Sequence, residues 1–166
     1  DQEITEKAVD FIKRKSIEGQ PFFAYLPYTQ THEPVDAHPD FAGSTGNGAF
    51  ADVLAQTDAY VGEILAIIDE LSIKENTIVI FTSDHGYSFD HPLGKDLSKE
   101  EINTPFLIYS NEFPLEKGRS SCFVESSIDL MPTITNLYSI DDDTKRSGSS
   151  IFDNNYKLTE KNFAVS

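Results

Sequence analysis

The sequence predicts an α/β fold, with a mostly parallel sheet flanked by helices. Three observations support this prediction: short continuous apolar runs, amphipathic helical segments between them, and long polar loops after the runs. Continuous apolar runs are typical of strands that are covered on both faces, and their alternation with helices indicates a layered arrangement. In such sheets ligands bind beyond the carboxyl ends of the strands, so functional residues are expected in the loops that follow.

The first expected helix begins at Thr5 and runs to about Glu18, with apolar side chains at helical spacing. Gly19 ends it, because glycine tolerates the left-handed turn that often closes a helix. The apolar run at residues 21–26 follows and is expected to form a buried strand. Residues 27–48 are rich in proline and glycine, which predicts a long loop of the kind that is usually functional.

The strongest helix signal covers residues 51–71, and buried strands are expected at residues 76–82 and 105–109. A last helix is expected at residues 126–138, where Pro132 is tolerable only near the start. The expected apolar stripe of the 51–71 helix consists of Leu54, Thr57, Val61, Ile64, Leu65, Ile68 and Leu71.

Composition excludes several classes of protein. The net charge of −15 over 166 residues should repel phosphate backbones, so a nucleic-acid partner is not expected. No apolar run approaches the roughly 18 residues that span a bilayer. The one cysteine, Cys122, cannot form an intrachain disulfide, and its context favours a buried thiol in a strand. Residues 162–165 are a further candidate strand.

Two polar clusters follow expected strand ends. His32, in the loop after the first strand, can act as a general acid or a metal ligand, although a loop histidine more often bonds nearby backbone. Asp84 and His85 follow the second strand, and together they can offer an oxygen and a nitrogen to one cation. The same residues with Gly86 are also common in ordinary turns, so this cluster alone decides little.

A third cluster contains His91 and Lys95, with Lys99 four residues further on. A lysine here can place a point charge against an anionic substrate. For a single loop lysine, a solvated surface charge is the more common role.

Taken together, four blocks of the chain resemble the sulfatase family, which belongs to the alkaline-phosphatase superfamily. The blocks occur in the family's order and the resemblance covers about residues 5 to 152, which is far more specific than any single motif. They are Phe11 to Pro34 with its PFFAYL run and His32, Asp58 to Leu65, Asn76 to Gly86 with its NTIVIFTSDHG run, and Asp129 to Thr133 with DLMPT.

The resemblance implies a role for each matching residue. His32 corresponds to the histidine that contacts the sulfate and protonates the leaving oxygen. Lys95 corresponds to the lysine that grips the sulfate, and Lys99 is a second candidate because the spacing to Pro105 is shorter than is common. His91 lies where one branch of the family has a loop histidine, so it is a candidate substrate contact.

The resemblance also implies cofactors. Asp84 and His85 correspond to two ligands of a divalent metal, with calcium expected first and zinc or manganese as alternatives, because calcium prefers oxygen over nitrogen. Sulfatases use a formylglycine made in a C/SxPSR motif. No such motif occurs in these residues, since Cys122 is followed by Phe123. The nucleophile and the other metal ligands are therefore expected upstream of residue 1.

The expected function is hydrolysis of carbohydrate or aryl sulfate esters. Residues 1–166 are then part of a catalytic domain, inactive by itself. One alternative is a phosphodiesterase, phosphonate hydrolase or phosphoglycerol transferase of the same superfamily. Another is a non-catalytic module that binds sulfated glycans. Export to the periplasm or the outside is expected from the family.

Overall fold

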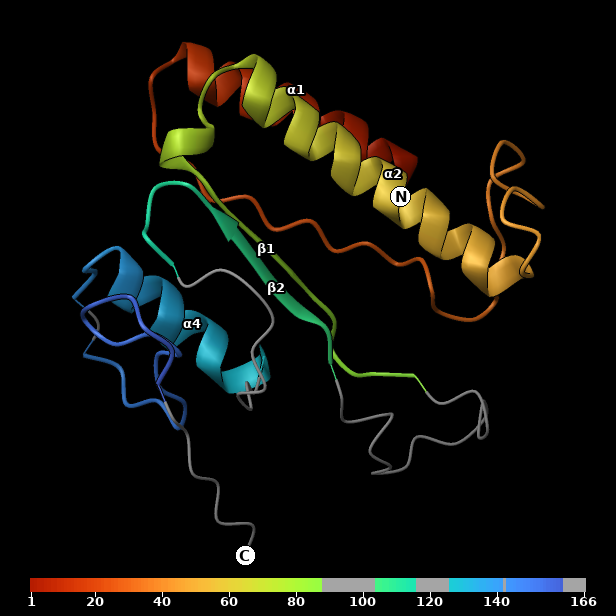
Figure 1. The fold of residues 1–166 in the computed structure, drawn as a ribbon. Coiled ribbons are helices and arrows are strands. Elements are labelled where there is room, and N and C mark those ends of the chain that lie inside the picture. The colour runs from red at the N-terminus through yellow and green to blue at the C-terminus, as the bar shows by residue number, and fades with distance from the viewer. Residues whose placement is uncertain (88–103, 116–125, 142, 160–166) are drawn as a thin grey trace, which may run out of the picture. The chain divides into compact units, whose positions relative to one another are not determined.

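The computed structural model describes residues 1–87, 104–115, 126–141 and 143–159 (Figure 1). These fall into two compact units, Asp1–Glu75 and Asn76–Ser166, and each unit is described by itself. The first contains two helices, and the second contains a strand pair with one helix. The elements are α1 (Gln2–Ile17), α2 (Ala49–Glu70), the short 3-10 helix η1 (Lys74–Asn76), β1 (Ile78–Thr82), β2 (Phe106–Ser110) and α4 (Ser126–Leu137).

In the first unit, α1 and α2 lie side by side (Figure 1). Thr5, Ala8 and Ile12 of α1 are buried at helical spacing, so the amphipathic pattern correctly predicted a packed face. Neither described helix of this unit combines the length and apolarity required to cross a bilayer.

The buried face of α2 differs from the predicted stripe. Leu54 is 48% exposed, whereas Asp52 and Gln56 are buried. The predicted stripe was therefore wrong at its N-terminal end, where the helix turns a polar face toward the preceding loop. The buried residues of α2 are Asp52, Val53, Gln56, Thr57, Tyr60, Ile64, Ile67 and Ile68.

Residues 21–26 do not form the predicted buried strand. The side chains of Phe23 and Tyr25 are 72% and 77% exposed. A strand exists only when a neighbouring strand accepts and donates its backbone hydrogen bonds. Within the described part of the chain, this segment belongs to no strand.

In the second unit, β1 and β2 pair antiparallel, with Thr82 opposite Phe106 and Ile80 opposite Ile108. Both strands lie within two residues of their predicted positions, but this pair is not parallel. Strand direction cannot be read from the apolar runs, because side-chain burial is alike in the two arrangements. As a result, residues 83–87 after β1 and residues 104–105 before β2 lie at the same end of the strand pair.

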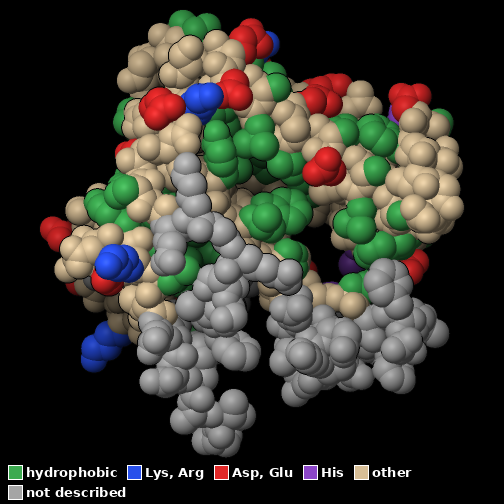
Figure 2. All heavy atoms as spheres, in the orientation of Figure 1, with side chains coloured by type: hydrophobic (Ala, Val, Ile, Leu, Met, Phe, Trp, Pro, Cys, Tyr) green, Lys and Arg blue, Asp and Glu red, His purple; other side chains and the backbone are tan. Residues whose placement is uncertain are grey.

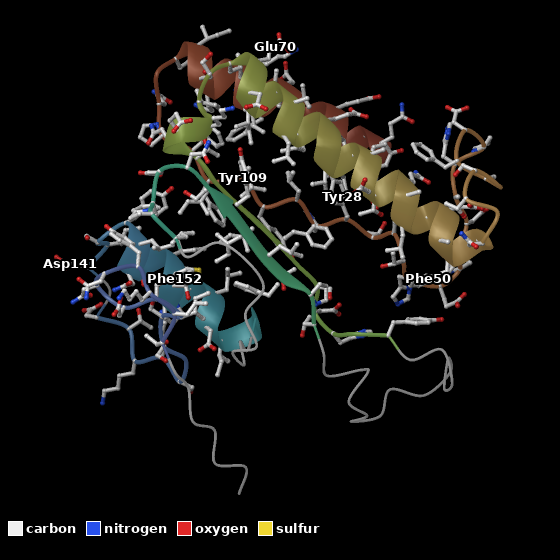
Figure 3. All side chains as sticks on the ribbon, viewed as in Figure 1. Tyr28, Phe50, Glu70, Tyr109, Asp141 and Phe152 are labelled. Carbon is white, nitrogen blue, oxygen red and sulfur yellow. The ribbon has the colours of Figure 1, made fainter. Side chains whose placement is uncertain are left out.

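One face of the strand pair covers the core of this unit. Ile78, Phe106 and Ile108 pack against a cluster formed by Leu137 of α4 and by Ile151 and Phe152 of the segment that follows (Figure 3). The position of the last helix was predicted to within one residue.

The DLMPT block has a structural role. Asp129 and Thr133 are 1% and 0% exposed. An Asp129 carboxylate oxygen accepts a hydrogen bond from Ser149 N at 3.0 Å. The Thr133 hydroxyl donates to Asp129 O at 2.7 Å and accepts from Ile151 N at 3.2 Å. Both side chains therefore tie residues 149–151 to α4, so that Ile151 reaches the core.

Gly148 lies against α4 next to this connection. Pro132 has no N–H to donate to the carbonyl of Ile128, four residues earlier, and Gly148 passes over that carbonyl. A Cβ at position 148 would lie 2.5 Å from the Ile128 carbonyl carbon and 2.8 Å from Asp129 Oδ1. Neither atom can withdraw, because one is helix backbone and the other is hydrogen-bonded.

We therefore expect Gly148→Ala to destabilise the protein by about 3 kcal/mol, the upper part of the range for overpacking. Calorimetry of the full-length protein measures this as a lower Tm. Gly62→Ala is the matched control, because Gly62 lies inside α2 with nothing within 4 Å of its Cβ position. An unchanged Tm for Gly148→Ala would show that the segment is not held against α4.

The charge of the surface agrees with the composition. Figure 2 shows several Asp and Glu side chains and few Lys or Arg side chains on the visible face. The acidic character of the sequence is therefore visible on this face of the described residues.

Candidate active site

The segment that leads to His32 is held by the first turn of α1. The carboxylate of Asp1 accepts hydrogen bonds from Thr29 N at 3.0 Å and from Gln30 N at 2.8 Å. The hydroxyl groups of Tyr28 and Thr5 lie 2.9 Å apart. Burial raises the pKa of Tyr28, so its phenol stays protonated near neutral pH. The chain therefore has a defined conformation immediately before His32.

His32 follows a strained residue. Thr31 has a φ of 75°, a left-handed conformation that β-branched residues rarely adopt. Such conformations persist only where the surrounding structure enforces them, and they are enriched at functional sites. The loop that carries His32 is thus more constrained than an ordinary surface loop.

The ring of His32 has an assigned tautomer. Its Nδ1 lies 2.7 Å from the carbonyl oxygen of Glu33. A carbonyl oxygen only accepts, so Nδ1 carries the hydrogen, and Nε2 is the nitrogen left to face a ligand. The side chain is exposed. A protonated Nε2 that is open to solvent suits donation of a proton to a departing oxygen.

Asp84 and His85 follow β1 after one intervening residue, Ser83, as the sequence predicted. His85 N donates to Asp84 Oδ1 at 3.1 Å, and the hydroxyl of Ser83 donates to His85 O at 2.7 Å. These bonds close a tight turn at the strand end. The turn brings Asp84 Oδ2 to 3.7 Å from His85 Nε2, so a carboxylate oxygen and a ring nitrogen lie side by side.

The ring of His85 is oriented in the same way as that of His32. Its Nδ1 lies 2.6 Å from the carbonyl oxygen of Gly86 and must therefore donate. Metal-ligating histidines usually donate one ring N–H to a carbonyl or carboxylate and bind the metal through the other nitrogen. The pair formed by Asp84 and His85 thus fits two ligands of one divalent cation.

Among the described residues, no group of three or more His, Cys, Asp and Glu side chains is arranged so that it could hold a metal ion. One oxygen and one nitrogen donor suit zinc or manganese better than calcium. The pair therefore fits part of a metal site.

Several predicted site residues cannot be placed. His91, Lys95 and Lys99 lie in residues 88–103, outside the described residues, and Cys122 also lies outside them. His32 belongs to the first unit, whereas Asp84 and His85 belong to the second. The geometry of His32 and the geometry of the Asp84–His85 pair are therefore described separately.

The sequence analysis missed Asp52, Gln56 and Tyr60. Asp52 and Gln56 hold the loop before α2. The ring of Tyr60 lies 6.3 Å, between centroids, from the ring of Tyr28 in the segment that leads to His32. The signal of these three residues in the sequence is a spacing of four residues on a side of the helix that lies outside the predicted apolar stripe.

Most of the chain matches the model of one protein family. The sulfatase family model matches residues 1–140 of the chain. The chain belongs to the sulfatase family. The resemblance that the four sequence blocks suggested is therefore confirmed.

Curated sulfatases are similar to parts of this chain. An N-acetylgalactosamine-6-O-sulfatase of Bacteroides thetaiotaomicron is 43% identical over 108 residues, which are 64% of this chain and 20% of that protein. An N-acetylgalactosamine-6-sulfatase of Canis lupus familiaris is 43% identical over 49% of this chain and 16% of its own length. A steryl-sulfatase of Rattus norvegicus is 38% identical over 51% of this chain and 14% of its own length.

Solved structures show the same fold. A Bacteroides thetaiotaomicron sulfatase from a study of glycosaminoglycan metabolism matches with a TM-score of 0.74 and 26% identity, over 88% of this chain and 34% of that one. The protein Ps i-CgsB matches with a TM-score of 0.76 and 20% identity, over 90% of this chain and 37% of that one, which shows the fold alone. The predicted α/β class is thus confirmed, and the chain spans about a third of these structures.

Proposed function

We propose that the protein containing this chain hydrolyses sulfate esters. The observation that carries the proposal is the Asp84–His85 turn at the end of β1, in a chain that the sulfatase family model matches over residues 1–140. The geometry of His32 supports it, because Nδ1 donates to Glu33 O and Nε2 is left to carry the reactive proton.

In this proposal, residues of the chain neutralise charge on the sulfate and protonate the departing oxygen. A sulfate ester is a poor electrophile with a negative charge, and the departing alkoxide is a strong base. His32 donates its Nε2 proton to the departing oxygen. Lys95, or Lys99 in its place, sets a positive charge against the sulfate oxygens as the bond to sulfur breaks.

Asp84 and His85 would hold a divalent cation through one carboxylate oxygen and one ring nitrogen. A bound cation would supply positive charge that stabilises the sulfate oxygens. Calcium is the expectation from the family, and the nitrogen donor of His85 supports zinc or manganese. A formylglycine outside residues 1–166 would supply the nucleophile.

We propose a sulfated carbohydrate as the substrate, with His91 as a candidate contact. Two of the similar proteins are named for N-acetylgalactosamine 6-sulfate. Ps i-CgsB has been crystallised with a neocarrahexaose. Steryl-sulfatase, which is similar over about half of the chain, is named for a different alcohol. An exported location follows from the same proposal, because glycans of this kind lie outside the cell.

The alternative is that the protein is a phosphoryl-transfer enzyme of the same superfamily. The nitrogen donor of His85 favours this alternative. The identity of the nucleophile distinguishes a sulfatase from a phosphoryl-transfer enzyme. Peptide mass spectrometry of the full-length protein should find a formylglycine in a C/SxPSR motif. An unmodified Thr or Ser nucleophile would instead indicate phosphoryl transfer. A protein without any nucleophile would be a glycan-binding module, and the proposal would be wrong.

A further inference from the structure

One face of α2 carries a row of buried polar side chains. Asp52, Gln56 and Tyr60 follow one another at intervals of four residues, so they lie on the same side of the helix. They are only 5%, 3% and 5% exposed. Polar groups so deeply buried require hydrogen-bond partners. Asp52 and Gln56 find theirs in the loop before α2, and Tyr60 bonds Gln56.

Asp52 holds the second half of that loop. Its carboxylate accepts hydrogen bonds from Gly43 N at 2.7 Å, from Thr45 N at 3.0 Å and from the Thr45 hydroxyl at 2.6 Å. Gly43 has a φ of 77°, which lets the chain turn around the carboxylate. The Thr45 hydroxyl and then the two N–H groups keep the pKa of Asp52 below its usual range. The carboxylate is therefore ionised at neutral pH and makes charge-assisted bonds.

Gln56 and Tyr60 hold the first half of the loop before α2. The Gln56 side chain accepts from His38 N at 2.9 Å and donates to the Tyr60 hydroxyl at 2.9 Å. The ring of Tyr60 packs edge-on against Phe41, with centroids 6.2 Å apart, and lies 6.3 Å from the ring of Tyr28. The polar row thus holds the loop in both halves, and Tyr60 contacts the segment that leads to His32.

The loop at residues 38–47 turns polar groups outward. His38, Asp40, Ser44 and Asn47 are exposed. Side chains of these types form hydrogen bonds with sugar hydroxyls, whereas a small aryl group offers them nothing to bond. A loop that is already ordered binds its ligand without a further cost in conformational entropy.

We infer that Asp52 is a positioning residue for substrate binding: its carboxylate preforms the loop at residues 38–47, which contacts the sugar residues of a sulfated glycan beyond the sulfated one. This inference rests on the proposed function. It predicts that Asp52 governs the KM of an oligosaccharide substrate and leaves the chemistry of sulfate release unchanged.

The test compares Asp52→Asn with Asp58→Asn in the full-length protein. Asparagine keeps the shape of the side chain but removes the charge and turns an amide NH₂ toward N–H donors. Asp58 is the matched control, because it lies on the exposed face of the same helix. Three quantities are measured: amide hydrogen exchange at residues 38–47, KM and kcat for a 6-sulfated galactosaminoglycan oligosaccharide, and the same constants for p-nitrophenyl sulfate.

For Asp52→Asn we expect faster exchange in the loop and a KM for the oligosaccharide raised about tenfold, as when the binding-competent population falls to a tenth. The KM for p-nitrophenyl sulfate and both kcat values should stay within about twofold, and Asp58→Asn should match the wild type throughout. A wild-type exchange pattern, or an equal change of KM for the two substrates, would overturn the inference. So would a parallel fall of both kcat values, because that indicates a merely structural role.

Failure of the proposed function gives a different result. A wild-type protein that releases sulfate from neither substrate would refute the sulfatase proposal, and the substrate role of Asp52 would fall with it. Faster exchange in Asp52→Asn would then still show that the carboxylate holds the loop.

Discussion

Replacing Asp84 with Asn should remove most of the divalent metal from the full-length protein and lower kcat for sulfate ester hydrolysis at least about 100-fold. The amide oxygen of asparagine is a weaker ligand than a carboxylate and carries no charge to balance the cation. The change is local, because the Asp84 side chain is exposed and its described contacts are with His85 alone.

The measurement is elemental analysis of purified wild-type and variant proteins, followed by kinetics with added calcium, zinc or manganese. Asp10→Asn is the matched control, because Asp10 is an exposed carboxylate on α1 whose side chain is 80% accessible. Equal metal content in wild type and Asp84→Asn would remove Asp84 from the metal site. The metal that restores most activity also identifies the native ion, which the Asp84–His85 donor set predicts to be one that accepts nitrogen.

His32→Ala should lower kcat for a sulfated sugar by at least about 100-fold, the scale of losing a general acid. The effect should be much smaller for p-nitrophenyl sulfate. A nitrophenolate leaves without protonation, whereas a sugar alkoxide requires a proton to depart. The difference between the losses of kcat on the two substrates therefore measures how far His32 acts as a general acid. The contact between Nδ1 and Glu33 O indicates this role.

Lys13→Ala is a suitable control, because Lys13 is exposed on α1. Equal losses on both substrates would mean that His32 contacts the sulfate without protonating the leaving oxygen. A kcat for the sugar within about threefold of the wild type would remove His32 from the mechanism altogether.

Helix positions could be predicted from the sequence because apolar side chains recur with the period of a helix. The described bounds of α1, α2 and α4 lie within three residues of those expected. The composition of the buried face of α2 could not be predicted. Asp52 and Gln56 are buried because the preceding loop returns to them, and that path depends on the turn at Gly43.

Strand pairing was less predictable. The apolar runs located β1 and β2, but pairing depends on hydrogen bonds to other segments and on direction, which side-chain patterns do not contain. For this reason the run at residues 21–26 reads as a strand in the sequence, although it pairs with no strand in the described part of the chain.

The place of Asp84 and His85 after β1 was predicted from the sequence, but the orientations of the candidate side chains were not. Asp84 and His85 lie at the end of β1, because a buried strand must be followed by a loop at the sheet edge. The orientations of His32 and His85 depend on the carbonyl oxygens of Glu33 and Gly86, and no sequence pattern specifies where a backbone oxygen points. The roles of Lys95, Lys99 and His91 remain predictions from the resemblance.

Release of inorganic sulfate by the full-length protein tests the proposed sulfatase activity. The assay compares kcat/KM for a 6-sulfated N-acetylgalactosamine substrate and p-nitrophenyl sulfate with that for bis-p-nitrophenyl phosphate, in wild type and His32→Ala. We expect both sulfate esters to be preferred and the loss of kcat/KM in His32→Ala to be larger for the sulfated sugar than for p-nitrophenyl sulfate. Preferential hydrolysis of the phosphate diester would contradict the proposed sulfatase activity, and would assign the acid and the Asp84–His85 pair to phosphoryl transfer.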